Sequence, residues 1–121
     1  MATNYSRQGD HIAILESLMQ HPTHSDGFVN SGDPVRINKL HGVALLDAAA
    51  ATDSIPVATE GVWNLTVSAN DGSSSAVAVG NYIYIGSTAT LSKLATDLLF
   101  GIALETITIS GTATIAVKLV H

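Results

Sequence analysis

The sequence contains no cysteine, so disulfide bonds, thiolate metal sites and cysteine nucleophiles are all excluded. Charged residues are also scarce: they make up 12% of the chain, against about 25% in an ordinary soluble domain. Hydrophobic residues reach 46% but aromatic residues only 5%, so small apolar and hydroxyl side chains must cover much of the surface. Such a surface is easily desolvated and suits packing against other subunits, although a neutral, soluble β-domain would have the same composition.

Cations are few and dispersed along the chain. Lysine and arginine together number five, and the formal net charge is −5 with histidine neutral. The five cations are Arg7, Arg36, Lys39, Lys93 and Lys118. Because no basic patch could neutralise a run of phosphates, we expect no nucleic-acid partner. The same scarcity argues against binding to an anionic membrane surface.

Long hydrophobic runs are missing as well. The longest apolar-rich stretch, GVALLDAAAA at 42–51, is far shorter than the roughly 18 residues that a membrane-spanning helix needs. The first fifteen residues, MATNYSRQGDHIAIL, lack the basic segment followed by an apolar segment that marks a secretory signal. We therefore expect a protein that is synthesised in the cytoplasm and has no membrane partner.

What the sequence does contain is a series of short segments in which apolar and polar residues alternate. A period of two predicts half-buried β-strands; in VWNLTV, for example, Trp63, Leu65 and Val67 share one face. The predicted strands lie at 11–15, 35–40, 42–46, 62–67, 82–85, 106–109 and 112–119. Turn-forming residues separate them, so we expect an all-β fold, either a small β-barrel or a β-sandwich.

Two segments depart from this pattern. In TLSKLATDLL at 90–99, Leu91, Leu94 and Leu98 are spaced as on one face of a helix, and Thr90 or Ser92 could cap it, which predicts one short helix there. Residues 16–30 contain proline and glycine and show no clear period. We expect a loop or insertion at 16–30, with a helical turn at its beginning.

One phrase of the sequence occurs twice. Residues 32–37 (GDPVRI) align with 80–85 (GNYIYI), and each is followed by a Gly-[Val/Ile]-Ala-Leu segment, at 42–45 and 101–104. The offset is 48 residues between the first glycines (32 to 80) and 59 between the second (42 to 101), and the extra residues fall in the segment predicted as helical. Because neither half could bury its apolar face alone, the repeat predicts two pseudo-symmetric β units closed around one core.

The same motifs carry a family resemblance. MATNY, SGDPV with GVAL, LLDAAAA, VATEGVW, and VGNYIYI with GIALE and TIAVKL resemble, in this order, the small bacteriophage capsid decoration (cement) proteins. The resemblance covers nearly the whole chain except 16–30, which looks like an insertion. It implies a β-rich structural virion protein on the outer capsid surface, which stabilises the phage head by clamping neighbouring major capsid subunits. The implied partners are the major capsid protein and further copies of the chain in a homotrimer.

Residues 1–10 are predicted to form an N-terminal arm, and residues 11–121 a single β-domain. The arm is polar, and tyrosine and arginine are typical anchors of an interface. Thr3, Asn4, Tyr5 and Arg7 are therefore candidate partner-binding residues, on the hypothesis that the arm orders on a partner's surface. The alternative interpretation is a frayed terminus.

Candidate sites for chemistry are weak. His21, His24 and Asp26 could hold a metal ion, but Pro22 argues against the helix that would align two histidines of an HxxH motif. No nucleophile elbow or phosphate loop occurs, so we expect no enzyme, no cofactor and no metal. The alternative function is a carbohydrate- or receptor-binding β-module on a virion. Its stacking residues would be Trp63, Tyr82 or Tyr84, although core packing is the simpler role for Trp63.

Overall fold

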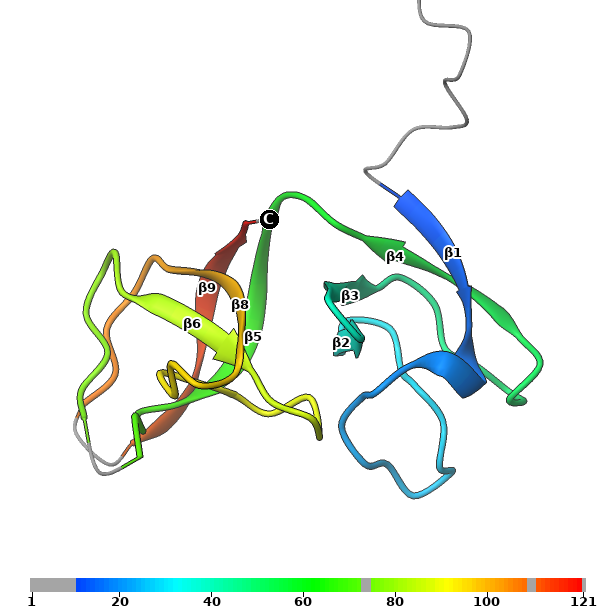
Figure 1. Ribbon diagram of the computed structural model, residues 1–121, viewed down its shortest axis with the longest axis horizontal. Helices are drawn as coiled ribbons and strands as arrows, with labels where there is room; N and C mark the ends of the chain where they lie inside the picture. Colours follow the sequence, from blue (N-terminus) through cyan, green and yellow to red (C-terminus); the bar gives the residue numbers. More distant parts are fainter. Residues whose placement is uncertain (1–10, 73–74, 109–110, 121) are drawn as a thin grey trace, which may run out of the picture.

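A computed structural model describes residues 11–72, 75–108 and 111–120, and its strands form two antiparallel sheets, one from each half of the chain (Figure 1). The strands are β1 (His11–Leu15), β2 (Pro34–Ile37), β3 (Leu40–Ala44), β4 (Ser54–Ala58), β5 (Val62–Ser68), β6 (Tyr82–Ile85), β7 (Leu91–Ser92), β8 (Leu98–Ala103) and β9 (Thr112–Leu119). Within the described ranges the one helical element is a 3-10 turn, η1 (Glu16–Leu18). The predicted all-β class is confirmed.

The two sheets have the same topology. Strands lie in the order β1-β4-β3-β2 in the first sheet and β5-β9-β8-β6-β7 in the second, so β7 is the one addition. Equivalent backbone hydrogen bonds hold the two units: Gly32 N donates to Ala44 O and Gly80 N to Ala103 O, each at 2.8 Å. The repeat in the sequence is therefore a repeat of structure.

The second glycine of each repeated phrase lies where two strands approach closely. A Cβ atom on Gly42 would lie 2.3 Å from the carbonyl oxygen of Ala58, and one on Gly101 would lie 2.5 Å from that of Lys118. Real Cβ atoms do not approach a backbone oxygen so closely. Any side chain at these positions would push β3 away from β4, or β8 away from β9.

The helix predicted at 90–99 is wrong. Leu91 belongs to β7, which pairs with β6, and Leu98 begins β8. A helix of ten residues is marginal by itself in water, whereas strand pairing satisfies the backbone and places Leu91 in the core, where it is 2% exposed. Residues 86–97 thus form an excursion between β6 and β8, and at its tip Ala89 adopts a φ of 61°.

Residues 16–30 begin with the predicted helical turn, η1, but they are more than a surface loop. Met19 and Val29 are buried in the core of the first half. Glu16 is also buried, and its Oε2 accepts a hydrogen bond from the backbone N–H of Val29 (3.3 Å) and lies 2.6 Å from His21 Nε2. The first sheet would lose part of its core without this segment.

The hydrophobic core consists of two clusters, so the expectation of one core closed by both halves is wrong. The cluster of the first half contains Met19, Val29, Val35, Ala44, Ala48, Ile55 and Val57. The cluster of the second half contains Leu65, Val67, Ala69, Val77, Ile83, Ile85, Ala89, Leu91, Phe100, Ala103, Ile107, Ile115, Val117 and Leu119. Val43, from β3 of the first half, belongs to the second cluster. Each unit thus forms its own core, and Val43 joins the two.

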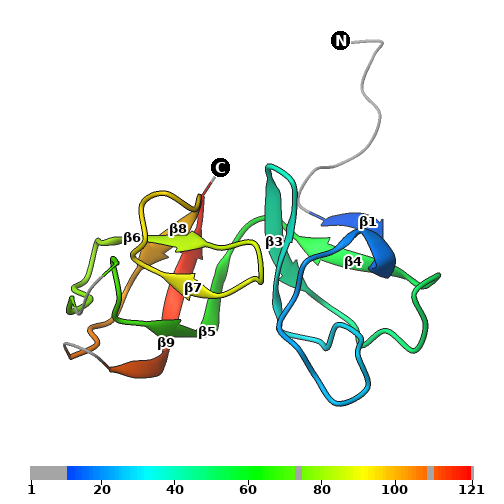
Figure 2. The same cartoon turned by 60° about the horizontal axis from the view of Figure 1, so that its bottom comes forward.

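Polar contacts reinforce the joint between the halves, where β3 approaches the second sheet (Figure 2). Arg36 Nη1 donates to the carbonyl oxygen of Ile85 at 3.1 Å. His41 Nε2 donates to the carbonyl oxygen of Val120, and the imidazole lies 5.3 Å from the ring of Phe100, centroid to centroid. The outer face of the first sheet is therefore occupied by the second half of the same chain.

Candidate partner-binding site

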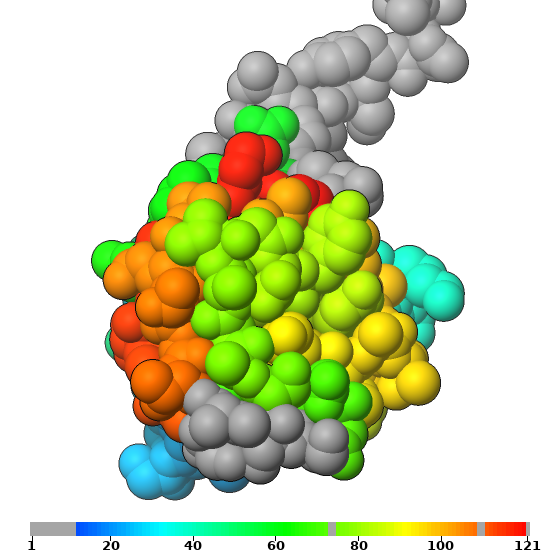
Figure 3. All heavy atoms as spheres, turned by 90° about the vertical axis from the view of Figure 1, so that its left-hand side faces the viewer, coloured from blue at the N-terminus to red at the C-terminus, as the bar shows by residue number. Residues whose placement is uncertain are grey.

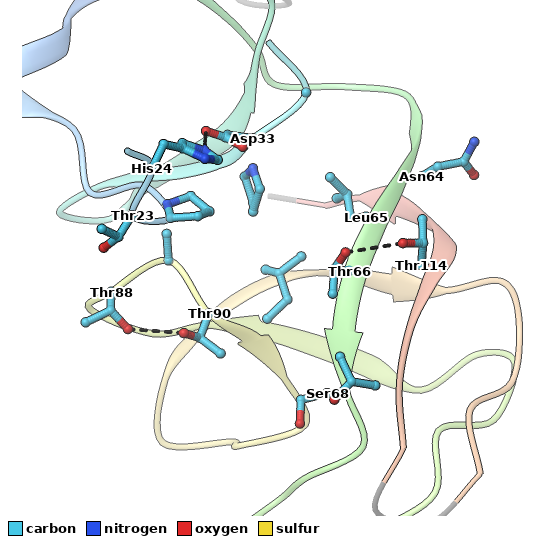
Figure 4. A pocket seen from close by; sticks show the side chains of 16 residues that line it. Thr23, His24, Asp33, Asn64, Leu65, Thr66, Ser68, Thr88, Thr90 and Thr114 are labelled. Carbon is cyan, nitrogen blue, oxygen red and sulfur yellow. Dashed lines mark hydrogen bonds and ion pairs between the residues drawn. The ribbon is translucent and has the colours of Figure 1, made fainter. Parts of the chain in front are cut away.

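A cleft of about 610 Å³ opens between the two halves (Figure 4). The first half contributes 22–24 and 32–34, and the second half contributes β5, the tip at 88–91 and the start of β9. Side chains with hydroxyl groups are frequent in the lining: Thr23, Thr66, Ser68, Thr88, Thr90, Thr112 and Thr114. Among the described residues that line the cleft, none is lysine, arginine, tryptophan, tyrosine or phenylalanine.

The wall from the first half is organised by Asp33. Its Oδ2 accepts hydrogen bonds from His24 Nε2 (2.6 Å) and from the backbone N–H of Asn30 (2.8 Å). In the second half, Asn81 Oδ1 accepts the equivalent bond from the backbone N–H of Ala78, also at 2.8 Å. The acceptor at this position of the repeat therefore closes a turn, and the negative charge of Asp33 additionally pairs with His24.

The substitution Asp33→Asn is expected to cost less than about 1 kcal/mol of unfolding free energy, because asparagine keeps the turn bond and loses only a partly exposed ion pair. Asp33→Ala should cost about 1–2 kcal/mol more, because the turn then also loses its acceptor. Urea unfolding of both variants measures the difference. Equal losses would contradict the assignment of a turn-closing role to this side chain.

The wall from the second half consists of β5 and the tip at 88–91. Thr66 on β5 and Thr114 on β9 lie side by side, with their hydroxyl oxygens 3.2 Å apart, and the hydroxyls of Thr88 and Thr90 are 3.1 Å apart (Figure 4). These hydroxyl pairs satisfy one another but each keeps further hydrogen-bonding capacity. The cleft therefore offers neutral donors and acceptors on this side.

The structure separates the residues of the predicted metal cluster. His21 contacts Glu16 and His24 contacts Asp33, each at 2.6 Å. Asp26 Oδ1 accepts a bond from the backbone N–H of Phe28 (3.0 Å). Within the described residues, no group of three or more metal-ligating side chains comes together.

The outer face of the second sheet carries a row of three apolar residues and one lysine that are exposed or partly exposed. Strand pairing places Lys118 between Val62 and Ile102, and Ile102 opposite Tyr82. Val62 and Tyr82 are each 55% exposed. We call Val62, Lys118, Ile102 and Tyr82 the outer row. The strands that carry Tyr82 and Ile102 lie side by side on the face shown in Figure 3, coloured yellow-green and orange.

The centre of the equivalent row of the first sheet is buried. Pairing there places Val43 between Ala58 and Pro34. In the repeat, Val43 corresponds to Ile102, and its two neighbours correspond to Lys118 and Tyr82. Val43 is fully buried and Ala58 is 2% exposed. The same face of the repeated unit is thus covered in one copy and open in the other.

The aromatic residues of the alternative function lie apart from the cleft. Trp63 is partly buried against the second core, and its indole N–H donates to the carbonyl oxygen of Glu60 at 2.9 Å. Much of the indole ring of Trp63 thus packs against the core, as the simpler prediction stated. Tyr82 and Tyr84 form an edge-on pair with ring centroids 6.5 Å apart.

The predicted arm residues Thr3, Asn4, Tyr5 and Arg7 lie outside the described residues, so their role stays a prediction. Among the residues that are described, no helix is long and apolar enough to cross a membrane.

The family model of phage cement proteins matches residues 16–119. The chain belongs to the phage cement protein family. The match includes every residue of the cleft and all strands of the two units except β1, and it gives this cement protein a structural, capsid-stabilising role at the virion. Searches of curated proteins and of solved structures returned no match.

The cleft of this cement protein was not predicted from the sequence. Two signals pointed toward it. Threonines occupy the outward positions of alternating strands, at Thr66, Thr112 and Thr114, and the two copies of the repeat differ in length at 86–97, the segment that carries the tip at 88–91. Neither signal shows which face of the first half meets the second.

Proposed function

We propose that this cement protein binds the outer surface of the phage head, where it clamps neighbouring major capsid subunits and assembles as a homotrimer. The observation that supports the proposal is the outer row, which is open in the second half while the centre of its equivalent in the first half is buried. Exposed apolar side chains that lie close together, here Ile102 and Tyr82 with Val62 beyond Lys118, are typical of interaction surfaces. A partner that covers the outer row would bury this face of the second sheet, as the second half of the chain already buries the equivalent face of the first sheet.

The mechanism is multivalent attachment. Each copy would contact more than one capsid subunit, and association of three copies would raise the effective concentration of every contact, so that individually weak contacts give firm retention. The net charge of −5 suits the outside of a shell, because a protein that faced the packaged DNA would bind better if it were basic.

Co-sedimentation with mature capsid shells that have been stripped of this protein tests the proposal. We expect saturable binding at a fixed ratio to the major capsid protein, and shells that then survive harsher heating. Failure of the folded protein to bind intact shells would overturn the proposal.

Deletion of residues 2–8 is expected to weaken attachment to shells about tenfold or more, because the anchors Tyr5 and Arg7 are lost together with Thr3 and Asn4. Titration of shells with the truncated protein measures the change. A control in which 2–8 are replaced by glycine and serine separates the side chains from the length of the arm. Unchanged affinity of the truncated protein would exclude the arm as an anchor.

A second candidate, a carbohydrate- or receptor-binding module, is supported by the exposure of Tyr82 beside Tyr84. Sugar-dependent quenching of the fluorescence of Trp63, or loss of glycan binding in Tyr82→Ala, would favour it. A glycan screen without binding to the intact protein would exclude the carbohydrate form of this function.

A further inference from the structure

The strand β5 has one free edge. It pairs with β9 on one side and ends the sheet on the other. Leu119 N donates to Gly61 O (3.0 Å). In an antiparallel ladder the backbone groups of alternate residues point to the same side, so Gly61, Trp63, Leu65 and Val67 bond to β9. The backbone N–H and C=O groups of Asn64 and Thr66, which lie between them, point away from β9. Among the described residues, no backbone group bonds to them there.

This edge lacks the usual protection against strand pairing. Proteins commonly guard a free edge with proline, with lysine or other charged residues, or with a β-bulge. The sequence of β5, VWNLTVS, contains no proline and no charged residue, and its pairing with β9 runs without a register shift over all seven residues. Strand β7 packs near β5 without pairing with it, so the template for another strand is the part of the edge that lines the cleft, from Asn64 to Ser68.

The cleft lies along the same edge. Asn64, Leu65, Thr66 and Ser68 line it, and in Figure 4 β9 lies on the far side of β5 from His24 and Thr88. A strand added to a sheet lies about 4.8 Å from its neighbour, which places it in the cleft, between β5 and the wall from the first half. Hydroxyl groups on the walls can satisfy the remaining backbone groups of such a strand.

The chemistry of the cleft favours a peptide over other ligands. The described residues of its lining include no lysine or arginine to bind an anion and no tryptophan, tyrosine or phenylalanine ring to stack on a sugar. The carboxylate of Asp33 is already engaged by His24 Nε2, at 2.6 Å. The threonine, serine, alanine and proline side chains of the walls leave room for small, uncharged side chains of an extended segment.

We propose that the free edge of β5 binds an extended, uncharged segment of the capsid shell protein as an additional β-strand in the cleft. The inference rests on the proposed function, because that function supplies the shell as the partner. Main-chain hydrogen bonds to Asn64 and Thr66 give the affinity, and the small side chains of the walls select the segment, as in other cases of β-strand addition.

The substitution Thr66→Pro tests this inference. Proline removes the outward N–H of Thr66 and leaves the ladder to β9 intact, since residues of this phase do not donate to β9. The control Thr66→Val loses the same hydroxyl and keeps the N–H. In titrations of stripped shells we expect Thr66→Pro to bind at least tenfold more weakly than the unmodified protein, and Thr66→Val to bind within about twofold of it.

A second measurement does not depend on a variant. Amide hydrogen exchange at Asn64 and Thr66 should be fast in the free protein and slow at least tenfold on shells. Binding of Thr66→Pro with full affinity, or unchanged exchange at both amides on saturated shells, would overturn the inference and leave the capsid role standing. Absence of binding by the unmodified protein would overturn both. Self-association in solution that Thr66→Pro abolishes would assign the edge to a second copy of the chain instead.

Discussion

Gly101→Ala will destabilise the protein by about 3 kcal/mol, the upper part of the range for overpacked cores. A Cβ atom at this position would lie 2.5 Å from the carbonyl oxygen of Lys118 and 2.8 Å from Cγ1 of Val117. The first obstacle belongs to the backbone, so rotation of a side chain does not relieve it, and β8 must separate from β9. The midpoint of urea unfolding measures the loss.

Gly86→Ala is the matched control. The nearest atom to a Cβ there is Oδ2 of Asp97, at 3.1 Å, which is the far end of a side chain that can move. We expect a change within about 1 kcal/mol, since alanine also restricts the unfolded chain. Similar losses for Gly101→Ala and Gly86→Ala would mean that the close approach of β8 and β9 is not what requires glycine.

Val43→Asp will have the largest effect on the joint between the halves, with an expected loss of about 4 kcal/mol or more. Val43 is fully buried and packs in the cluster of the second half, so an aspartate there would be a buried charge without a partner. Because this side chain links the two cores, we also expect a broader unfolding transition. Urea and thermal unfolding, each followed by circular dichroism, measure both effects.

The repeat supplies the control for this substitution. Ile102 occupies the position of Val43 in the second unit but lies on the open outer row, where it is partly exposed. Ile102→Asp should cost about 1–2 kcal/mol and should instead weaken binding to shells. If Ile102→Asp destabilises the fold as much as Val43→Asp and leaves shell binding unchanged, the open face is not an interaction surface.

Local alternation predicts some strands well, but the strand predicted at 106–109 is wrong, because the described residues there form an isolated bridge between Ile107 and Val77. On β5 the predicted inward residues Leu65 and Val67 are buried, and Asn64 and Thr66 are exposed. The same reasoning failed at 90–99, because the leucine spacing of a helix is also produced by a short strand, a turn and the start of the next strand. Leu91 is in a strand and not in a helix because β7 pairs with β6, and strand pairing depends on residues outside the local window.

The cleft and the joint were harder to predict for another physical reason. Arg36 and His41 donate to the carbonyl oxygens of Ile85 and Val120. Because every residue has a backbone carbonyl, the sequence does not indicate which one accepts these hydrogen bonds. The periodicity of each unit indicates which side chains face its own core. It does not indicate that the outer face of one unit meets the other, which is how Val43 is buried.

The two copies of the repeat also differ in a way that bears on how the protein arose. Between its second and third strands the first copy has a two-residue turn, Asn38 and Lys39, whereas the second copy has residues 86–97. Duplication and fusion of a half-length gene would explain the shared topology, and a later insertion in one copy would explain the difference. That insertion supplies the tip that walls the cleft, so the ancestral half, and any symmetric pair of such halves, would have lacked this site. Evolution of a new binding site would then have required asymmetry between the copies, which only a fused chain can maintain.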